Sequence, residues 1–443
     1  MGDQSAKSAG VSPLDRAHAA RLAKQPDDAL RLAASILTAS TEDVGAAWLV
    51  ARLLSEAGRT APAGEAAIEL VARFIRRGDL PSAVLGAQLA GETGKDVDSV
   101  ARAIAEAFGR GSPRLGAVSP APPPLPTEIE IAPFFAKLSG AALLDAAEKT
   151  LARAMQTPDR LPNNTKLPAL PLFSDLAPSS LQQLLLTFQL HEVAAGDYVV
   201  RQGQEGHEAY LLARGVLNVV RERDEGPTVL AVLGPGAIFG EMALVSAAPR
   251  AASVVAVETA HVFAAPRTDL ESLGAREPSI GRALGEFCHH RMLANLMRHS
   301  QILSKVEPAR RAELIARFKP QNFPMGAMMV RQGTEAERLF LIASGGVEVR
   351  RTDSDGDRVV LAQLGPGDVV GEISLVLRRP ATADVVAVHT TVALELTRDQ
   401  FQEAIHEYPG LLQELYELAT RRDEETRSVV AQPALDVSDT VLL

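Results

Sequence analysis

The chain has 443 residues, of which 46% are hydrophobic, and a formal net charge of −10. This length suits roughly two to four domains with buried cores, and the acidic balance argues against a protein that coats nucleic acid, whose footprint is a basic surface. The single cysteine, Cys288, excludes an intrachain disulfide framework and a multi-cysteine metal site. We interpret Cys288 as a buried helical thiol beside two surface histidines.

Nothing in the sequence indicates a membrane segment. The start of the chain has no apolar core, and no run of eighteen apolar residues occurs. We therefore expect a cytoplasmic protein with neither a membrane nor a nucleic acid as its partner. Abundant alanine and arginine, with only 4% aromatic residues, suggest a bacterial source.

Residues 14–110 are predicted to form one helix after another, because apolar residues recur three and four apart and breaks fall at glycines and prolines. A helical hairpin takes about 34 to 37 residues, which suits a tetratricopeptide-like solenoid. The detailed aromatic and glycine pattern of that repeat is missing. A small helical bundle is the alternative.

A proline-rich linker is predicted over 111–131, since its dense prolines fit neither helix nor sheet. One helix is expected over 132–158, and a second short linker leads from there to residue 168. Residues 428–443 are expected to form a flexible tail.

Between these segments the sequence is duplicated. Arg201-Gln202-Gly203 returns 130 residues later as Arg331-Gln332-Gly333, and short apolar runs alternate with glycine turns in both copies, as in antiparallel strands. We therefore predict an α+β protein. An N-terminal α-helical, solenoid-like domain is followed by two antiparallel β-roll (jelly-roll) domains with flanking helices, at 168–295 and 296–427.

The stretch most informative about function is FGEMALVSAAPRAASV, over residues 239–254 of the first copy. It places the carboxylate of Glu241 nine residues before the guanidinium of Arg250, among small residues. A carboxylate accepts hydrogen bonds from ribose hydroxyls, a guanidinium grips a phosphate, and small residues let backbone N–H groups approach an anion. The stretch predicts a site for a sugar phosphate.

This pattern resembles the phosphate-binding cassette of cyclic nucleotide-binding domains, the family of the catabolite activator protein and the regulatory subunits of cyclic AMP-dependent kinase. The resemblance implies that Glu241 accepts from the ribose 2′-hydroxyl and that Arg250 binds the exocyclic phosphate. The ligand-binding residues that it implies are Gly240, Glu241, Met242, Ala243, Arg250, Ala251, Ala252 and Ser253.

The resemblance also bears on the ligand and on how the pocket closes. Ala251, directly after the arginine, resembles the cyclic AMP type more than the cyclic GMP type. The apolar run 229–233 is expected to help wall the purine. The family covers its pocket with a residue of a C-terminal helix, and Arg282, Phe287 and Arg291 are candidates.

The second copy departs from the pattern. It keeps Gly371 and Glu372 but has Ala381 in the place of Arg250. Losing one partner of a charged hydrogen-bonded pair costs ~2–5 kcal/mol, so we predict a degenerate site that does not bind cyclic nucleotide in the usual way. Asp384 would repel an anion if it faced the pocket, while a neighbouring cation could substitute from a different angle; Arg378 and Arg379 are the candidates.

The favoured function is a non-enzymatic receptor. Cyclic nucleotide, cyclic AMP before cyclic GMP, binds the first roll and shifts its helices, and the helical domain signals to an unidentified protein partner. The alternative is a scaffold whose cyclic nucleotide-binding folds no longer bind ligand.

Three further functions are disfavoured. A transcription factor needs a recognition module, for which no room follows the second roll. A kinase regulatory subunit needs paired arginines in an inhibitory segment, which 112–171 does not offer, and Arg350-Arg351-Thr352 lies inside the second roll. No residues are left over for a catalytic domain and the histidines are not spaced as metal ligands, so neither an enzyme nor a metal or cofactor is expected.

Overall fold

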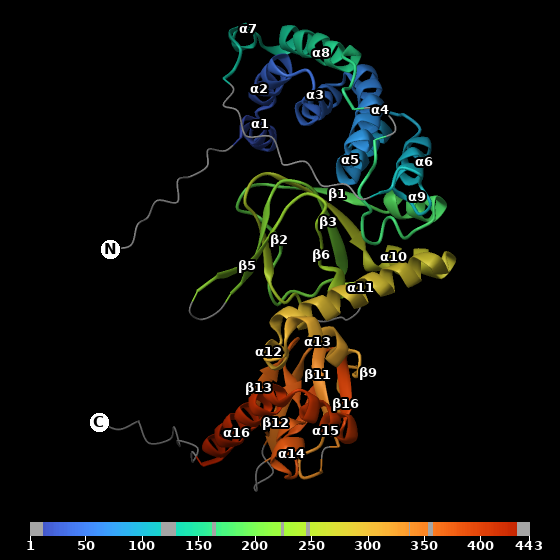
Figure 1. The fold of residues 1–443 in the computed structure, drawn as a ribbon. Helices are drawn as coiled ribbons and strands as arrows, with labels where there is room; N and C mark the ends of the chain where they lie inside the picture. The colour runs from blue at the N-terminus through green and yellow to red at the C-terminus, as the bar shows by residue number, and fades with distance from the viewer. Residues whose placement is uncertain are drawn as a thin grey trace, which may run out of the picture. The chain divides into compact units, whose positions relative to one another are not determined.

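The structure is a computed structural model. It describes residues 12–116, 130–161, 165–222, 226–244, 249–335, 337–352 and 358–431, without the side chains of 299 and 427–431. Internal contacts group the chain into two compact units (Figure 1). The first holds Met1–Gln204, Glu208–Gly240 and Arg250–Leu284, and the second holds Glu205–His207, Glu241–Pro249 and Gly285–Leu443.

The first unit begins with a helical array in which each helix packs against the next (Figure 1). The helices are α1 (Pro13–Leu22), α2 (Pro26–Ala39), α3 (Val44–Glu56), α4 (Thr60–Arg77), α5 (Leu80–Glu92) and α6 (Val97–Phe108). Side chains that accept a backbone N–H cap four of them, which fixes where each begins: Ser12, Asp43, Asp79 and Asp96. The predicted helical region is confirmed, whereas a tetratricopeptide-like repeat is not.

Two helices occupy the stretch where one is predicted over 132–158. They are α7 (Pro133–Ala136) and α8 (Gly140–Gln156). Ser139, with φ −151° and ψ 161°, has an extended backbone, and this separates the two. Helix α9 (Pro178–Leu186) follows and packs against α6. Residues 117–129 of the predicted linker and 432–443 of the predicted tail lie outside the described residues.

The first roll consists of two four-stranded antiparallel sheets, with strand orders β1-β8-β3-β6 and β2-β7-β4-β5. Its strands are β1 (Gln189–Val193), β2 (Tyr198–Val200), β3 (Glu208–Arg214), β4 (Leu217–Arg221), β5 (Thr228–Leu233), β6 (Ile238–Phe239), β7 (Ser253–Ala256) and β8 (Ala260–Pro266). The space between the sheets is filled by alternate apolar side chains such as Leu212, Phe239 and Val262.

The second roll repeats this arrangement, with strand orders β9-β16-β11-β14 and β10-β15-β12-β13. Its strands are β9 (Lys319–Phe323), β10 (Met328–Val330), β11 (Arg338–Ser344), β12 (Val347–Thr352), β13 (Arg358–Leu364), β14 (Val369–Val370), β15 (Asp384–Ala387) and β16 (Thr391–Thr397). The duplication extends to irregularities: the bulge between Val219 and Val220 of β4 recurs between Val349 and Arg350 of β12. The predicted fold class is confirmed.

Helices follow each roll. They are α10 (Arg267–Arg276), α11 (Pro278–His299), α12 (Gln301–Ser304) and α13 (Pro308–Ile315) between the rolls, and α15 (Arg398–Glu407) and α16 (Pro409–Ala431) after the second. Leu411 and Leu415 anchor α16 in the core that the second roll shares with its helices. None of the described helices has the length and apolar character needed to cross a bilayer.

Within the first unit, the helical array meets the first roll through buried polar side chains. The rings of His18 on α1 and His261 on β8 lie 5.0 Å apart, and Trp48 lies 5.2 Å from His261. Arg21 pairs with Glu192 of β1 at 2.7 Å, and His261 Nε2 lies 3.3 Å from the same carboxylate. Burial lowers the pKa of both histidines, so they are neutral at pH 7.

Two carboxyl groups at this contact have pKa values shifted in opposite directions. Burial alone raises a carboxyl pKa, but hydrogen bonds from His261 and Arg21 hold the pKa of Glu192 at about 2. Burial and the neighbouring Asp15 raise the pKa of Glu258 to about 7. The contact between array and roll therefore contains one carboxyl that titrates near neutrality and two histidines that stay uncharged there.

Candidate functional site

Each roll has a glycine with a left-handed backbone where the cassette begins. The φ angles are +72° at Gly240 and +88° at Gly371. A Cβ atom would lie 3.2 Å from the Glu208 carbonyl oxygen at the first position and 2.3 Å from the Arg338 carbonyl oxygen at the second. Only glycine fits both the angle and the space, and it turns the chain from the strand into a short helix. That helix is η1 (Glu241–Leu244), a 3₁₀ turn, in the first cassette and α14 (Glu372–Leu377) in the second.

The guanidinium of Arg250 is held by the backbone of the first roll. Its Nη1 donates to the Gly240 carbonyl at 3.0 Å and its Nη2 to the Glu208 carbonyl at 2.8 Å. Its carbon lies 5.5 Å from the ring centre of Tyr210, and burial with the nearby Glu208 carboxylate raises the pKa of that tyrosine. These contacts fix the plane of the guanidinium. A guanidinium that binds a phosphate through two parallel hydrogen bonds needs such a fixed plane.

The residues after Arg250 differ in their surroundings. Ala251 is exposed and Ala252 is half-buried, whereas Ser253 is fully buried. The Ser253 hydroxyl accepts from the Gln202 backbone N–H at 2.9 Å and donates to the Glu222 carboxylate at 3.0 Å. Ser253 therefore fastens the end of the cassette to the turn after β2.

Glu241, the first residue of η1, is 4% exposed and paired with α11. Nε of Arg291 lies 3.3 Å from its carboxylate, and Sγ of Cys288 donates to its carbonyl at 3.6 Å. Burial and the Glu241 charge raise the pKa of Cys288 to about 12, which keeps the thiol protonated as a donor. Of the three capping candidates, Arg291 is the one that contacts the cassette carboxylate; Arg282 is exposed and Phe287 is half-buried.

Two further residues of η1 point away from solvent. Ala243 is 4% exposed, and Met242 packs against the core of the second unit. A small residue at position 243 lets the short helix lie close to its neighbours, while Met242 ties it to apolar side chains.

The pairing of a helix arginine with the cassette glutamate is repeated in the second roll. Nη1 of Arg422 on α16 lies 2.8 Å from Oε1 of Glu372 and donates to the Val369 carbonyl at 2.6 Å. Arg422 follows Arg291 by the same number of residues as Glu372 follows Glu241. Extending the offset of the duplication beyond the cassette would have identified this arginine from the sequence.

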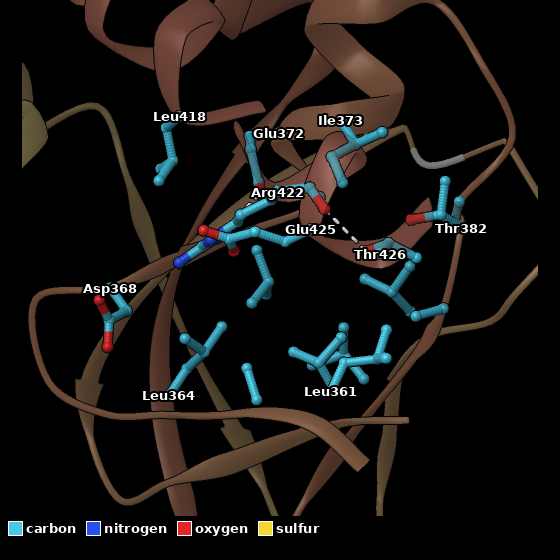
Figure 2. A pocket seen from close by; sticks show the side chains of 18 of the residues that line it. Leu361, Leu364, Asp368, Glu372, Ile373, Thr382, Leu418, Arg422, Glu425 and Thr426 are labelled. Carbon is cyan, nitrogen blue, oxygen red and sulfur yellow. Dashed lines mark hydrogen bonds and ion pairs between the residues drawn. The ribbon is translucent and has the colours of Figure 1, made fainter. Parts of the chain in front are cut away.

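A cavity of about 360 Å³ lies beside Glu372. Strand β13 supplies apolar lining and α16 supplies mixed lining: Leu361, Ala362, Leu364, Leu418, Arg421, Arg422 and Glu425. Figure 2 shows Arg422 reaching toward Glu372, with Leu361 and Leu364 across the cavity. Strand β13 is the duplicate of β5, the strand expected to wall the purine in the first roll.

The backbone around Ala381 matches that around Arg250. The Ala381 N–H donates to Thr334 and its carbonyl accepts from Gly333, both at 2.8 Å. Arg250 makes the same two bonds, to Gln204 at 2.8 Å and from Gly203 at 2.9 Å. Ala381 lines the cavity, so the second site differs from the first by a missing guanidinium in a retained frame.

The side chains expected to modify the second site do not line this cavity in the described part of the chain. Asp384 accepts from the Gln332 N–H at 2.7 Å, which is the bond that Ser253 makes in the first roll. Arg379 pairs with Asp423 of α16 at 3.1 Å, and Arg378 lines a separate groove. The cationic side chains at the cavity come from α16 instead.

The described residues contain no group of three or more histidine, cysteine, aspartate or glutamate side chains that could hold a metal ion. Cys288 is buried and both neighbouring histidines, His289 and His290, are exposed.

A sequence model of the family described as cyclic nucleotide-binding domain matches residues 190–277 and 320–408, one match in each roll. The chain carries two cyclic nucleotide-binding domains in tandem. Domains of this kind are non-enzymatic.

Curated relatives cover part of the chain. A cAMP-dependent protein kinase regulatory subunit of Dictyostelium discoideum is 30% identical over 47% of this chain and 62% of its own length. One of Mycosarcoma maydis is 31% identical over 50% of this chain and 42% of its own. The chain thus spans less than two thirds of the length of either relative.

Among solved structures, the regulatory domain of Toxoplasma gondii PKA, crystallised with cAMP, is 24% identical. The match covers 57% of this chain and 92% of that one, with a TM-score of 0.27.

Proposed function

We propose that this chain is a receptor for cyclic AMP that signals to a protein partner through its helices. The pairing of Arg291 with Glu241 carries the proposal. The motif assigns Glu241 to the ribose 2′-hydroxyl, so a bound nucleotide and the α11 arginine use one carboxylate. Ligand binding thereby changes what holds α11, and a ligand biases an equilibrium through such differential contacts.

The proposed binding residues are those of the first cassette. Glu241 takes the ribose, Arg250 takes the phosphate, and the backbone N–H groups at Gly240, Met242 and Ala243 face the anion. Ala251 and Ala252 leave room for its oxygens. Ser253 supports the cassette through its bonds to the neighbouring turn rather than by contact with ligand.

Cyclic AMP is favoured over cyclic GMP for two reasons. Ala251 follows the cassette arginine, as in the cyclic AMP type, and the relatives named above are called cAMP-dependent protein kinase regulatory subunits. The second cassette, without an arginine at position 381, is proposed not to bind cyclic nucleotide in the usual way.

Titration calorimetry of the full chain with cyclic AMP and cyclic GMP tests the proposal. We expect one site per chain and tighter binding of cyclic AMP. Arg282→Ala, which changes an exposed arginine of α11, is a control that should leave the affinity unchanged. Binding of neither nucleotide would favour the scaffold alternative, and two equal sites would overturn the asymmetry between the rolls.

A kinase regulatory subunit is the second candidate, supported by the similarity to such subunits. Against it, Arg350-Arg351-Thr352 lies in β12, which is hydrogen-bonded to strands on both sides, so it is not available as an inhibitory segment. Adding the full chain to a cAMP-dependent protein kinase catalytic subunit decides the point. Inhibition that cyclic AMP relieves would establish the kinase role.

Domain limits, location and source remain proposals. We propose a helical domain at 14–110, a linker at 111–131, a helical segment at 132–158, binding domains at 168–295 and 296–427, and a tail from 428, although α16 itself continues to Ala431. A cytoplasmic location is kept as a prediction. The composition suggests a bacterial source, which the relatives named above, from an amoeba and a fungus, do not support.

A further inference from the structure

Helix α8 packs out of sequence order. In the helical array each helix contacts its neighbour along the chain, and α9 continues the series by packing on α6. Helix α8 lies between α6 and α9 in sequence but packs against α2, α3 and α4 (Figure 1). It therefore lies across the array as an added helix, which is how helix-in-groove ligands bind.

The contact surface of α8 is a narrow apolar stripe. Leu143, Ala147, Leu151 and Ala154 recur at helical spacing and are at most 2% exposed. With Phe135 of α7, the two leucines are the large apolar side chains of the described segment 130–161 that are fully buried. The alanines let the α8 backbone lie close to the array. A helix that binds this surface therefore needs large and small side chains in the same order as α8.

The array holds this segment through arginines at three levels. Arg31 of α2 donates to the Leu138 carbonyl at 3.0 and 2.9 Å, before α8 begins. Arg59, just before α4, pairs with Asp145 at 2.7 Å and Glu148 at 3.3 Å, in the middle of α8.

At the far end, Arg73 of α4 is 2% exposed and donates to the Met155 and Thr157 carbonyls at 2.8 and 2.9 Å. Arg76 and Arg77 both pair with Asp159, at 3.0 and 2.8 Å. Arginines of α2–α4 and of the turn before α4 thus pair with three carboxylates of this segment, Asp145, Glu148 and Asp159, and with the carbonyls at the end of α8.

We propose that the surface of α2–α4 is a docking site for an amphipathic helix with carboxylates on one flank, and that α8 is its built-in occupant. The external ligand is a protein helix with leucine-sized residues at i and i+8, small residues at i+4 and i+11, and carboxylates on one flank. Few large apolar side chains hold α8, but both its ends are tethered, and a tether gives a high effective local concentration. A partner helix therefore binds when α8 is loosened.

The proposal rests on the proposed function only in taking the helical array as the part that contacts the protein partner. Its test uses no nucleotide, so the two can fail separately. The probe is a fluorescein-labelled peptide with the sequence of residues 130–160, titrated into the full chain by anisotropy. The double variant Leu143→Asp, Leu151→Asp frees the groove, and Ala152→Asp places a charge at an exposed position of the same helix as control.

We expect at least tenfold tighter peptide binding to the double variant than to the wild type or the control. Adding Arg59→Glu to the double variant should weaken binding several-fold, because it repels the peptide carboxylates. Hydrogen exchange follows α2–α4 in parallel, and their amides should stay protected. Loss of that protection would show α8 to be an integral part of the array core, and unchanged peptide affinity with α2–α4 intact would show that no docking site exists; either result overturns the proposal.

Discussion

The two rolls of this chain share a backbone and differ in one decisive side chain. Strands, bulge positions, the left-handed cassette glycine and the arginine that pairs with the cassette glutamate occur in both. The hydrogen bonds around position 250 are also reproduced around position 381, yet the guanidinium is present only in the first roll. A fold with its frame intact can therefore lose a ligand contact without losing its structure.

The largest expected effect is on ligand affinity at the first roll. Arg250→Ala removes the proposed phosphate contact, and losing such a charged pair costs ~2–5 kcal/mol, roughly thirtyfold to several thousandfold in Kd. Calorimetry with cyclic AMP measures it. Arg250→Lys keeps the charge but not the planar guanidinium, so its affinity should lie between those of the wild type and the alanine variant. Wild-type affinity in the alanine variant would show that Arg250 is not part of the site.

The next largest effect is on stability, and it should be unequal between the rolls. Arg422→Ala leaves the Glu372 carboxylate, 4% exposed, without its guanidinium, which costs about 3 kcal/mol for a buried pair. Arg291→Ala should cost less, because that arginine is 41% exposed and water screens its pair. Hydrogen exchange of the flanking strands measures both; equal losses would contradict the difference in burial.

A third contrast is in pH dependence. Burial lowers the folded pKa of His18 and His261 below the unfolded value near 6.5, so the stability that they contribute above that pH is lost as pH falls. The pKa of Glu258 is raised to about 7, so this carboxyl takes up a proton in the folded state first. It therefore stabilises the fold as pH falls and offsets the effect of one histidine. Two histidines outweigh one carboxyl, so the free energy of unfolding of the first unit falls as pH drops below the unfolded histidine pKa of about 6.5.

Fluorescence of Trp48, the only tryptophan, reports urea unfolding of the first unit across this range. His261→Gln should flatten the dependence. The second roll has Val392 at the duplicate position of His261, so its hydrogen exchange should lack this slope; an equal slope in both rolls would assign it to other groups.

The smallest expected effect is a gain. Ala381→Arg places a guanidinium in the retained frame and should add a second, weaker cyclic nucleotide site, about tenfold poorer than the first. It is weaker because Phe340 stands where Tyr210 lines the first arginine. Calorimetry should show the number of nucleotides bound per chain rising from one toward two. The control Ala381→Leu adds bulk without charge and should leave this number at one.

Much of the fold could be predicted because the sequence repeats itself. The returning Arg-Gln-Gly triplet and the paired glycines locate both rolls, and the cassette motif indicates Glu241 and Arg250 without any coordinates. The role of Asp384 could not be predicted, because the direction of its side chain depends on the Gln332 N–H, which the fold brings near. The place of α8 could not be predicted either, since its periodicity shows a buried stripe but not which helices cover it.

The duplication also distinguishes one helix arginine from its neighbours. Arg291 is one of three capping candidates, and in the sequence its offset of 131 residues to Arg422 is what separates it from Arg282 and Phe287. A long side chain on a helix has many possible partners, so burial of Glu241 and Glu372 in the folded chain is what makes these two arginines specific.

The buried sulfur of Cys288 gives the chain a chemical reporter of its own. The thiol is 2% exposed, bonded to the Glu241 carbonyl and held protonated by a pKa of about 12. Alkylating reagents react with an accessible thiolate, so modification is slow while α11 stays on the cassette. The chain has no second cysteine, so no label has to be introduced. Comparing the alkylation rate with and without nucleotide therefore measures how fast α11 leaves the cassette.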